Sequence, residues 1–284
     1  MPSIEGLRAG LKELGVIEGR DVTLDVVNAT GDVRRIEEAA RRFEREKVLL
    51  VFCTPTTTTT IVKRVTTSVP VVFMVGTDPV ASGFVASYAQ PGGRLTGVHY
   101  LTTDLTGKRL ELLKDLLPKL HRVMTIYTLR HGPAEASARV AREAGKRLGI
   151  EVIERTFTSR AELQQLIAAL KPGEADAYLW VSDAAVAVQV EALIAKTRAI
   201  RLPMIVYDEE IAEQGALVSY GVDTREAGRE SAKHVQRILG GARPAEVPVE
   251  NVTRLRFVLN RRTANELHIT VPPAMIVRFD RVIE

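Results

Sequence analysis

The sequence predicts an α/β protein in which parallel sheets are flanked by helices. Apolar runs of strand length alternate with amphipathic segments of helical length along almost all of the 284 residues. This alternation is typical of parallel sheets that are covered on both faces. The strands form two groups, one before Leu101 and one after it, and no Gly/Ser-rich linker separates them. We therefore expect two lobes that are joined by short, direct crossovers.

Apart from a short helix expected at 80–88, the first group combines three helices with four strands. Apolar residues at helical spacing predict a helix over 3–14, and Asp32 is a suitable N-cap for a helix over 32–46. Periodicity also predicts a helix over 55–68, although the β-branched run 56–60 has poor helix propensity. Strands are expected at residues 22–27, 48–53, 71–75 and 95–100.

The second group continues the alternation to the end of the chain. Pro118, Gly149 and the pair Gly240-Gly241 are the signals that end three of its helices. Helices are expected at 105–117, 133–148, 160–170, 184–198, 209–214, 224–239 and 263–267. Strands are expected at 122–128, 150–157, 175–181, 204–207, 217–220, 247–252 and 254–259.

The composition excludes several classes of protein. The net charge is +4 and the pI is about 9.2, but basic and acidic residues are mixed, as in 37–47. Such mixing indicates solvated helix faces, so we expect no nucleic-acid partner. No apolar run approaches the roughly 18 residues that span a bilayer, and no secretory signal precedes Ile4. We expect no direct membrane insertion, and a buried thiol at the one cysteine, Cys53.

Motifs for chemistry are missing from the sequence. It contains no Gly-x-Gly-x-x-Gly after a strand, no Walker loop and no Gly-x-Ser-x-Gly elbow. The five histidines have no metal-binding spacing, and one cysteine cannot form a zinc set. We therefore expect no cofactor, no metal and no enzymatic activity.

Several blocks of sequence resemble one known family. The chain resembles the substrate-binding proteins of ABC transporters that include tryptophan- and tyrosine-binding members. The blocks that carry the resemblance are Gly6–Gly15 with Glu18-Gly19, Thr77–Val80 with Pro91–Val98, Gly107–Lys114, Gly215–Gly221, Ile238–Ala245 and Val247–Glu250. The resemblance covers nearly the whole chain and implies the type I periplasmic-binding-protein fold, with two Rossmann-like lobes and a ligand cleft between them.

The resemblance also implies a division of the chain. We expect lobe 1 to comprise residues 1–101 and 222–252, and lobe 2 to comprise 102–221 and 253–284. The family has a strand before its first helix, whereas this chain starts inside that helix, so we expect the first strand of lobe 1 to be missing. The resemblance places the protein in the periplasm, or lipid-anchored outside the cell, although the chain as given has no signal segment.

Candidate ligand residues of lobe 1 follow the carboxyl ends of its strands, where open α/β sheets bind ligands. Thr54, Thr56 and Thr57 lie at a helix N-terminus that can hold a ligand carboxylate, or Thr54 or Thr56 caps that helix. Thr77 and Asp78 form a second polar group. Asp78 can accept from an ammonium or cap a helix over 80–88, and Tyr100 can stack on an apolar ligand or pack as a hinge residue.

Candidate residues of lobe 2 occupy the corresponding positions. Ser182 and Asp183 follow a strand, and Asp183 either accepts from an ammonium, as the resemblance implies, or caps a helix. Tyr127 and Tyr207 suit an aromatic or apolar ligand side chain. Asp208 can reach the ligand or begin the next helix, whereas Trp180 inside the strand is expected in the core.

These features predict the solute-binding component of an ABC importer that closes by a hinge on a small amino-acid-like ligand. Its partners would be that amino acid and the transmembrane subunits of an ABC permease. One alternative is the ligand-sensing domain of a regulatory or signalling protein with the same fold. A less favoured alternative is an enzyme on a doubly wound fold.

Overall fold

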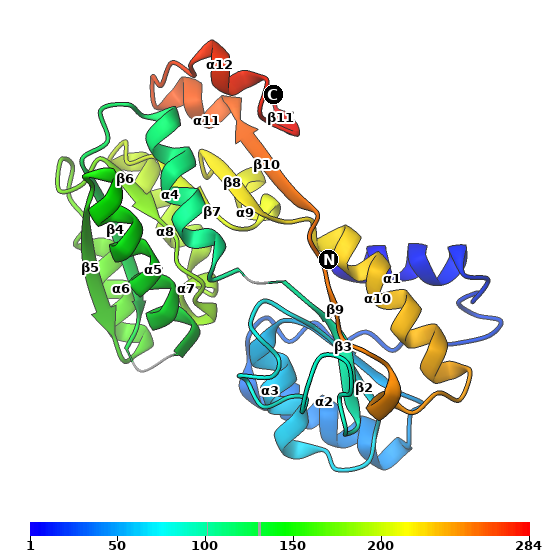
Figure 1. Cartoon of the computed structure of the whole chain (residues 1–284). Coiled ribbons are helices and arrows are strands. Elements are labelled where there is room, and N and C mark those ends of the chain that lie inside the picture. Colours follow the sequence, from blue (N-terminus) through cyan, green and yellow to red (C-terminus); the bar gives the residue numbers. More distant parts are fainter. Residues whose placement is uncertain (101, 130–131) are drawn as a thin grey trace. The chain divides into compact units, whose positions relative to one another are not determined.

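The computed structural model describes residues 1–100, 102–129 and 132–284. The chain divides into two compact units (Figure 1). Unit 1 comprises Met1–Leu101 and Asp223–Arg254, and unit 2 comprises Thr102–Val222 and Leu255–Glu284. The chain therefore passes three times from one unit to the other.

Unit 1 is built on a four-stranded parallel sheet. Its strands lie in the order β1 (Val51–Cys53), β2 (Val71–Val75), β3 (Leu95–His99) and β9 (Glu250–Asn251). All five residues of β2 are buried, as expected for a continuous apolar run in the middle of a parallel sheet. The carboxyl ends of β1, β2 and β3 consequently meet at one edge of the sheet.

Helices cover both faces of this sheet (Figure 1). The helices α1 (Pro2–Glu13) and α10 (Thr224–Leu239) pack with Val72 on one face. The helices α2 (Val33–Glu46) and α3 (Thr56–Val65) pack with Val71, Phe73 and Val75 on the other. Alternate residues of β2 thus enter two different apolar clusters, as the two-residue period of a strand requires.

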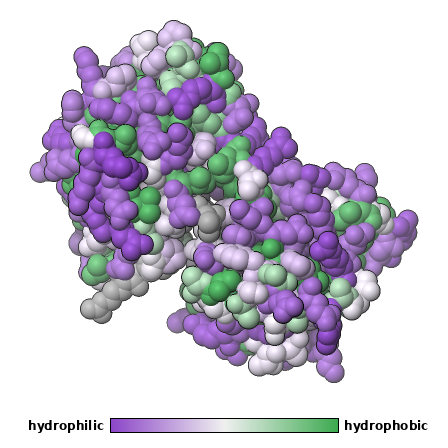
Figure 2. All heavy atoms as spheres, in the orientation of Figure 1, coloured by the Kyte–Doolittle hydropathy of each residue, from purple (hydrophilic) through white to green (hydrophobic). Residues whose placement is uncertain are grey.

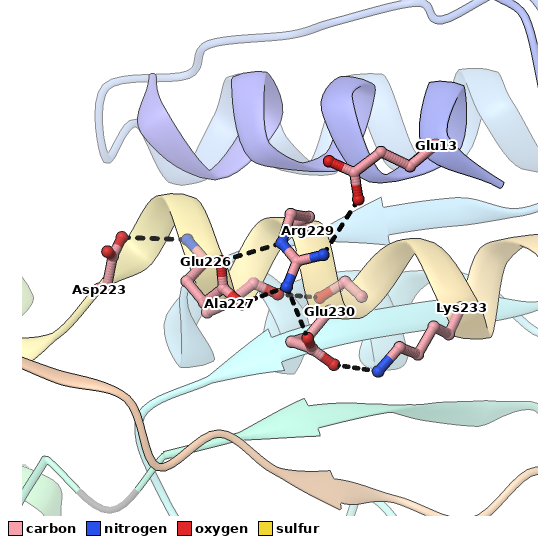
Figure 3. Close-up of polar contacts among 8 residues, drawn as sticks. Glu13, Asp223, Glu226, Ala227, Arg229, Glu230 and Lys233 are labelled. Carbon is pink, nitrogen blue, oxygen red and sulfur yellow. Dashed lines mark hydrogen bonds and ion pairs between the residues drawn. The ribbon is translucent and has the colours of Figure 1, made fainter.

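Helices α1 and α10 are in backbone contact. A Cβ atom placed on Gly6 of α1 would lie 1.8 Å from the carbonyl oxygen of Arg225 in α10. Figure 3 shows that Arg229 of α10 reaches across this contact to Glu13 of α1, with 3.0 Å between nitrogen and oxygen. The same guanidinium also pairs with Glu226 of its own helix (Figure 3). Gly6 permits the close approach of the two helix backbones, and the ion pair of Arg229 with Glu13 also links the two helices.

Helix α2 is fastened to the turn between α3 and β2 by one carboxylate. The side chain of Glu44 accepts hydrogen bonds from the backbone N–H groups of Thr67, Ser68 and Val69 and from the hydroxyls of Thr67 and Ser68. Burial alone would raise the pKa of this carboxyl. The hydrogen bonds outweigh burial and lower the pKa to about 2.

Unit 2 is built on a seven-stranded sheet. Only the pairing of β8 with β10 is antiparallel, and every other pairing in this sheet is parallel. The strand order is β11 (Arg281–Ile283), β10 (Leu255–Asn260), β8 (Val218–Val222), β7 (Met204–Val206), β6 (Ala177–Leu179), β4 (Arg122–Thr128) and β5 (Glu151–Phe157). Three neighbouring parallel strands therefore have candidate residues at or beyond their carboxyl ends: Tyr127 near the end of β4, Ser182 after β6 and Tyr207 after β7.

Two apolar clusters sandwich the sheet of unit 2. One contains residues of α4 (Leu105–Leu116) and α5 (Gly132–Leu148), together with the short C-terminal helices. The other contains residues of α6 (Arg160–Ala168), α8 (Val190–Ala199) and α9 (Glu209–Gln214), with Trp180 fully buried among them. The sequence-based expectation that Trp180 is a core residue is therefore confirmed.

Several sequence-based element predictions are wrong. The predicted strand at 22–27 contains only an isolated bridge between Glu18 and Val22. No described strand pairs with this segment, and Val26 and Val27 are 41% and 38% exposed. The predicted helix at 80–88 is a series of turns, because the left-handed φ of +67° at Gly83 ends the single turn begun at Asp78.

Element bounds near the C-terminus also differ. The predicted helix at 184–198 is broken into α7 (Ala184–Ala187) and α8, and the strand expected at 247–252 is reduced to β9. The expected helix at 263–267 is α11 (Arg261–Glu266). A 3₁₀ turn (Pro244–Glu246), helix α12 (Pro273–Ile276) and strand β11 were not predicted, because each is four residues or fewer.

The surface of each unit is predominantly hydrophilic on the face shown in Figure 2, where apolar residues form small separate patches. Among the described residues, none of the helices combines the length and the hydrophobicity required to cross a bilayer.

Candidate ligand-binding site

A group of hydroxyls lies at the carboxyl ends of β1 and β2 in unit 1. The Oγ1 atoms of Thr56 and Thr77 are 3.3 Å apart, and the Gly76 N–H donates to Thr56 Oγ1 at 3.2 Å. Thr77 also contacts Ser82, with 3.1 Å between hydroxyl oxygens. Helix α3 begins here behind Pro55, and no side chain caps its N-terminus. The start of α3 thus lies within the segment that contains Thr54, Thr56 and Thr57, and none of these side chains caps it.

Asp78 lies beside this hydroxyl group and holds the following turn. Its Oδ1 accepts from the N–H groups of Val80 at 2.8 Å and Ala81 at 3.1 Å. Burial raises the pKa of the carboxyl, but these bonds and one from the Tyr88 hydroxyl outweigh burial, so that the pKa is lowered. The capping interpretation describes these contacts, and a ligand role for Asp78 stays a prediction.

The strand β3 brings Tyr100 to the same edge. The Tyr100 N–H donates to the carbonyl oxygen of Val75 at 2.9 Å, which fixes its backbone next to the end of β2. Just before it, His99 stacks on Tyr88 with ring centroids 5.0 Å apart. The structure thus gathers all the candidates of lobe 1 at one sheet edge of unit 1.

In unit 2, both carboxylate oxygens of Asp183 accept hydrogen bonds from backbone N–H groups. Oδ1 accepts from the N–H groups of Ala185 and Val186 at the start of α7, and Oδ2 accepts from the Thr128 N–H at 2.5 Å. The residue is 1% exposed. Asp183 therefore caps a helix and ties the end of β4 to the loop after β6, in which Ser182 lies.

Tyr127 has its hydroxyl occupied as well. The hydroxyl donates to Glu154 Oε2 at 2.6 Å, and Glu154 in turn pairs with Arg142 at 2.7 Å. Burial and the Glu154 carboxylate raise the pKa of Tyr127 to about 12. This hydroxyl belongs to a polar chain within the unit, and a ligand role for Tyr127 stays a prediction.

Tyr207 and Asp208 follow β7 and have a different environment. The ring of Tyr207 meets Trp180 edge-on, with centroids 6.1 Å apart and planes at 81°. Asp208 accepts from the Glu210 N–H at 2.9 Å as the N-cap of α9. Burial, assisted by the nearby Glu210 and Glu209 carboxylates, raises the pKa of Asp208 to about 6 despite this bond. The surroundings of Asp208 thus disfavour its ionised form, and a ligand role for Asp208 stays a prediction.

Arg109 of α4 is a residue that the sequence-based reasoning missed. Its side chain is fully buried beside Tyr207, with the guanidinium carbon 5.7 Å from the ring centroid. Burial lowers the pKa of the guanidinium to about 10. The signal was available: Thr106, Arg109, Leu113 and Leu116 lie on one helical stripe, and a charge among apolar positions marks a buried cation.

The structure therefore gathers the sequence candidates into two groups, one at the carboxyl strand ends of each unit. Thr54, Thr56, Thr57, Thr77, Asp78 and Tyr100 form the group in unit 1, and Tyr127, Ser182, Asp183, Tyr207 and Asp208 form the group in unit 2. Within the described ranges, no three His, Cys, Asp or Glu side chains are grouped so that they could hold a metal ion.

The chain matches one family of known proteins over nearly its whole length. Residues 2–283 match the model of the family described as ABC transporter substrate binding protein. The chain belongs to this family. It is a substrate-binding protein rather than an enzyme, and family membership implies a small-molecule ligand and an ABC permease as partners, as predicted.

Relatives agree with this assignment. The chain is 25% identical over 271 residues to a tyrosine-binding protein of Clostridioides difficile. The aligned region covers 94% of this chain and 77% of that protein. Two solved structures, each covering 99% of this chain and 94% of theirs, have TM-scores of 0.88. One is a conserved domain protein from Vibrio cholerae at 27% identity, and the other is an ABC domain from Streptococcus pneumonia in complex with L-Trp at 23%. The predicted type I periplasmic-binding-protein fold is confirmed.

Proposed function

We propose that this substrate-binding protein binds an aromatic amino acid as a zwitterion. The observation that carries the proposal is Asp208, a carboxylate with a raised pKa that directly follows Tyr207, whose ring packs against Trp180. An ammonium group would relieve the unfavourable burial of this charge, because a close opposite charge favours the ionised carboxylate. Relatives that bind tyrosine and tryptophan add support.

The carboxylate of the ligand is assigned to unit 1. The uncapped N-terminus of α3 and the hydroxyls of Thr54, Thr56, Thr57 and Thr77 offer donors to an anion, and the helix dipole favours negative charge there. Tyr100 and Tyr207 are assigned to the side chain of the ligand. The proposal retains the expectation from the sequence that binding is accompanied by closure about a hinge.

Asp208 is preferred over Asp183 as the acceptor for the ammonium. Asp183 already accepts three backbone N–H groups, whereas Asp208 accepts one. Asp183 is assigned to holding the loops of the sheet edge and Asp78 to holding the turn after β2, whereas Ser182 remains a candidate ligand contact. We further propose that the protein acts outside the cytoplasmic membrane, either in the periplasm or anchored by a lipid.

A thermal-shift screen of the purified protein against the twenty amino acids, with sugars and purines as comparison, tests the proposal. A ligand at a hundredfold excess over its Kd adds about 2.7 kcal/mol to the free energy of unfolding. We expect the largest shifts with tyrosine, tryptophan and phenylalanine. A shift with sugars or purines alone would refute the amino-acid assignment, and isothermal titration would then measure the Kd of the ligand that binds.

A further inference from the structure

The side chain of Arg109 joins two stretches that lie far apart in the sequence. Its Nε donates to the carbonyl oxygen of Tyr220 at 2.7 Å, across 111 positions of the chain. Its Nη1 donates to the carbonyl oxygen of Thr102 at 3.2 Å and lies 3.4 Å from Thr106 Oγ1. Arg109 and Tyr220 belong to two of the sequence blocks that carry the family resemblance, and here these blocks meet.

The two carbonyl groups occupy defined places in the chain. The first part of unit 2 runs from Thr102 to Val222, so Thr102 is its first residue and Tyr220 precedes its last by two. Arg109 therefore holds, with one guanidinium, both ends of the segment through which the chain enters and leaves this unit. A change in the position of Arg109 would alter its hydrogen bonds at both ends of this segment, at Thr102 and at Tyr220.

The other contact of Arg109 is with Tyr207. The guanidinium lies over the ring of Tyr207, and that ring packs nearly perpendicular to Trp180. The backbone of Tyr207 is also close to β8, because a Cβ atom on Gly221 would lie 1.9 Å from the Tyr207 carbonyl oxygen. Tyr207, Arg109 and the end of β8 consequently form one closely packed group.

Stability alone does not account for an arginine at this position. The side chain is fully buried, no described carboxylate pairs with it, and Nη2 has no hydrogen-bond partner among the described residues. Desolvating an unpaired charge is costly, and apolar residues of similar volume commonly replace buried ions without loss of stability. What the arginine adds is a rigid fork that reaches two carbonyls and an aromatic face together.

We propose that Arg109 is a positioning residue that couples Tyr207 to the two chain segments at which the first part of unit 2 begins and ends. Through this residue, a ligand that contacts Tyr207 alters the backbone at residues 102–106 and 218–222. The role of the ligand in this coupling rests on the proposed function, whereas the coupling between Tyr207 and the two segments does not.

A double-mutant cycle on the free protein tests the coupling without a ligand. Amide hydrogen exchange at 102–106 and 218–222 is measured in the wild type, Tyr207→Leu, Arg109→Met and the double variant. We expect Tyr207→Leu to accelerate exchange about tenfold in the wild type but less than twofold in the Arg109→Met background, as for residues that act through each other. Equal effects of Tyr207→Leu in both backgrounds would refute the proposal.

A second arm uses L-tyrosine at saturation as the probe. We expect it to slow exchange at both segments at least fivefold in the wild type and by less than twofold in Arg109→Met, even though Arg109→Met still binds. Equal protection in both proteins would overturn the role of Arg109. If no amino acid stabilises the wild type, the proposed function fails, and the ligand-free cycle still decides the coupling.

Controls separate coupling from loss of structure. Arg122→Met removes another guanidinium of unit 2 that donates to a backbone carbonyl, that of Gly173 at 2.9 Å, and should leave exchange at 102–106 unchanged. If Arg109→Met does not fold, Arg109→Lys replaces it, because lysine keeps the charge and loses the fork. The lysine variant should show the same loss of coupling, and wild-type coupling in it would contradict the proposal.

Discussion

Asp208→Asn is expected to stabilise the free protein while it weakens the binding of amino acids. Asn keeps the oxygen that accepts from the Glu210 N–H and is close in shape to Asp, so the cap of α9 is retained. The charge, which burial and three neighbouring glutamates disfavour, is removed. If the Asp208 carboxylate binds the ligand, its removal should raise the free energy of unfolding and lower the affinity for amino acids.

The magnitude follows from the shift in pKa. The pKa of Asp208 is raised from 3.8 to about 6, and each pKa unit corresponds to about 1.4 kcal/mol, which sets an upper limit near 3 kcal/mol. Asp208 is partly accessible to solvent, which screens its charge. We therefore expect Asp208→Asn to raise the free energy of unfolding at pH 7 by about 1–2 kcal/mol.

The pH dependence gives a sharper test. Between pH 4 and pH 6 the native state holds the proton on Asp208 more tightly than the unfolded state does, so ionisation costs the wild type stability as the pH rises. The advantage of Asp208→Asn should be absent below about pH 4, grow up to about pH 6 and remain constant above. Urea unfolding at several pH values measures this difference.

Binding supplies the other half of the test. Loss of the carboxylate should raise the Kd for L-tyrosine at least tenfold, since a lost charge partner costs about 2 kcal/mol or more. Asp32→Asn is the matched control, because Asp32 is an exposed N-cap with a similar bond to the helix. The reasoning is refuted if Asp208→Asn destabilises the protein at pH 7 or leaves the Kd unchanged.

Other substitutions test separate features. Gly6→Ala should cost about 3 kcal/mol by urea unfolding, because its Cβ would collide with the Arg225 carbonyl, whereas Gly93→Ala, with open space around it, should cost less than about 1 kcal/mol. Glu44→Gln should lose about 1–2 kcal/mol at pH 7, and the loss should vanish as the pH falls from 4.5 through about 2, where the wild-type carboxyl protonates. Tyr207→Leu should raise the Kd for tyrosine more than the Kd for leucine, measured by calorimetry, and equal losses would remove it from the side-chain pocket.

The fold was predictable where the apolar pattern is long. Runs such as 71–75 and 122–128 are buried on both faces, so composition alone marked them as strands of parallel sheets. The segment 22–27 has a comparable pattern, yet a strand also needs a partner, and none of the described strands lies beside it. Local sequence carries no information about that missing partner.

The candidate site was predictable in position and less so in role. Parallel strands bring their carboxyl ends together, which placed Thr56, Thr77, Asp183 and Asp208 correctly at the edges of the two sheets. Capping and ligand binding use the same short acidic residues at the same positions, so the sequence left both open. Only the tertiary contacts, such as the Thr128 N–H on Asp183, distinguish a carboxylate that is already satisfied from one that is not.

The two sheets differ in how their outer strands are protected. The edge strand β5 of unit 2 carries Glu151, Glu154 and Arg155, charges that discourage the addition of another strand. The edge strand β1 of unit 1 is the uncharged triplet Val51–Cys53, and Leu49 before it is 71% exposed. In concentrated solution, intermolecular strand pairing should therefore begin in unit 1, so a charge at residue 49 is the change that would improve solubility without approaching either group of candidate ligand residues.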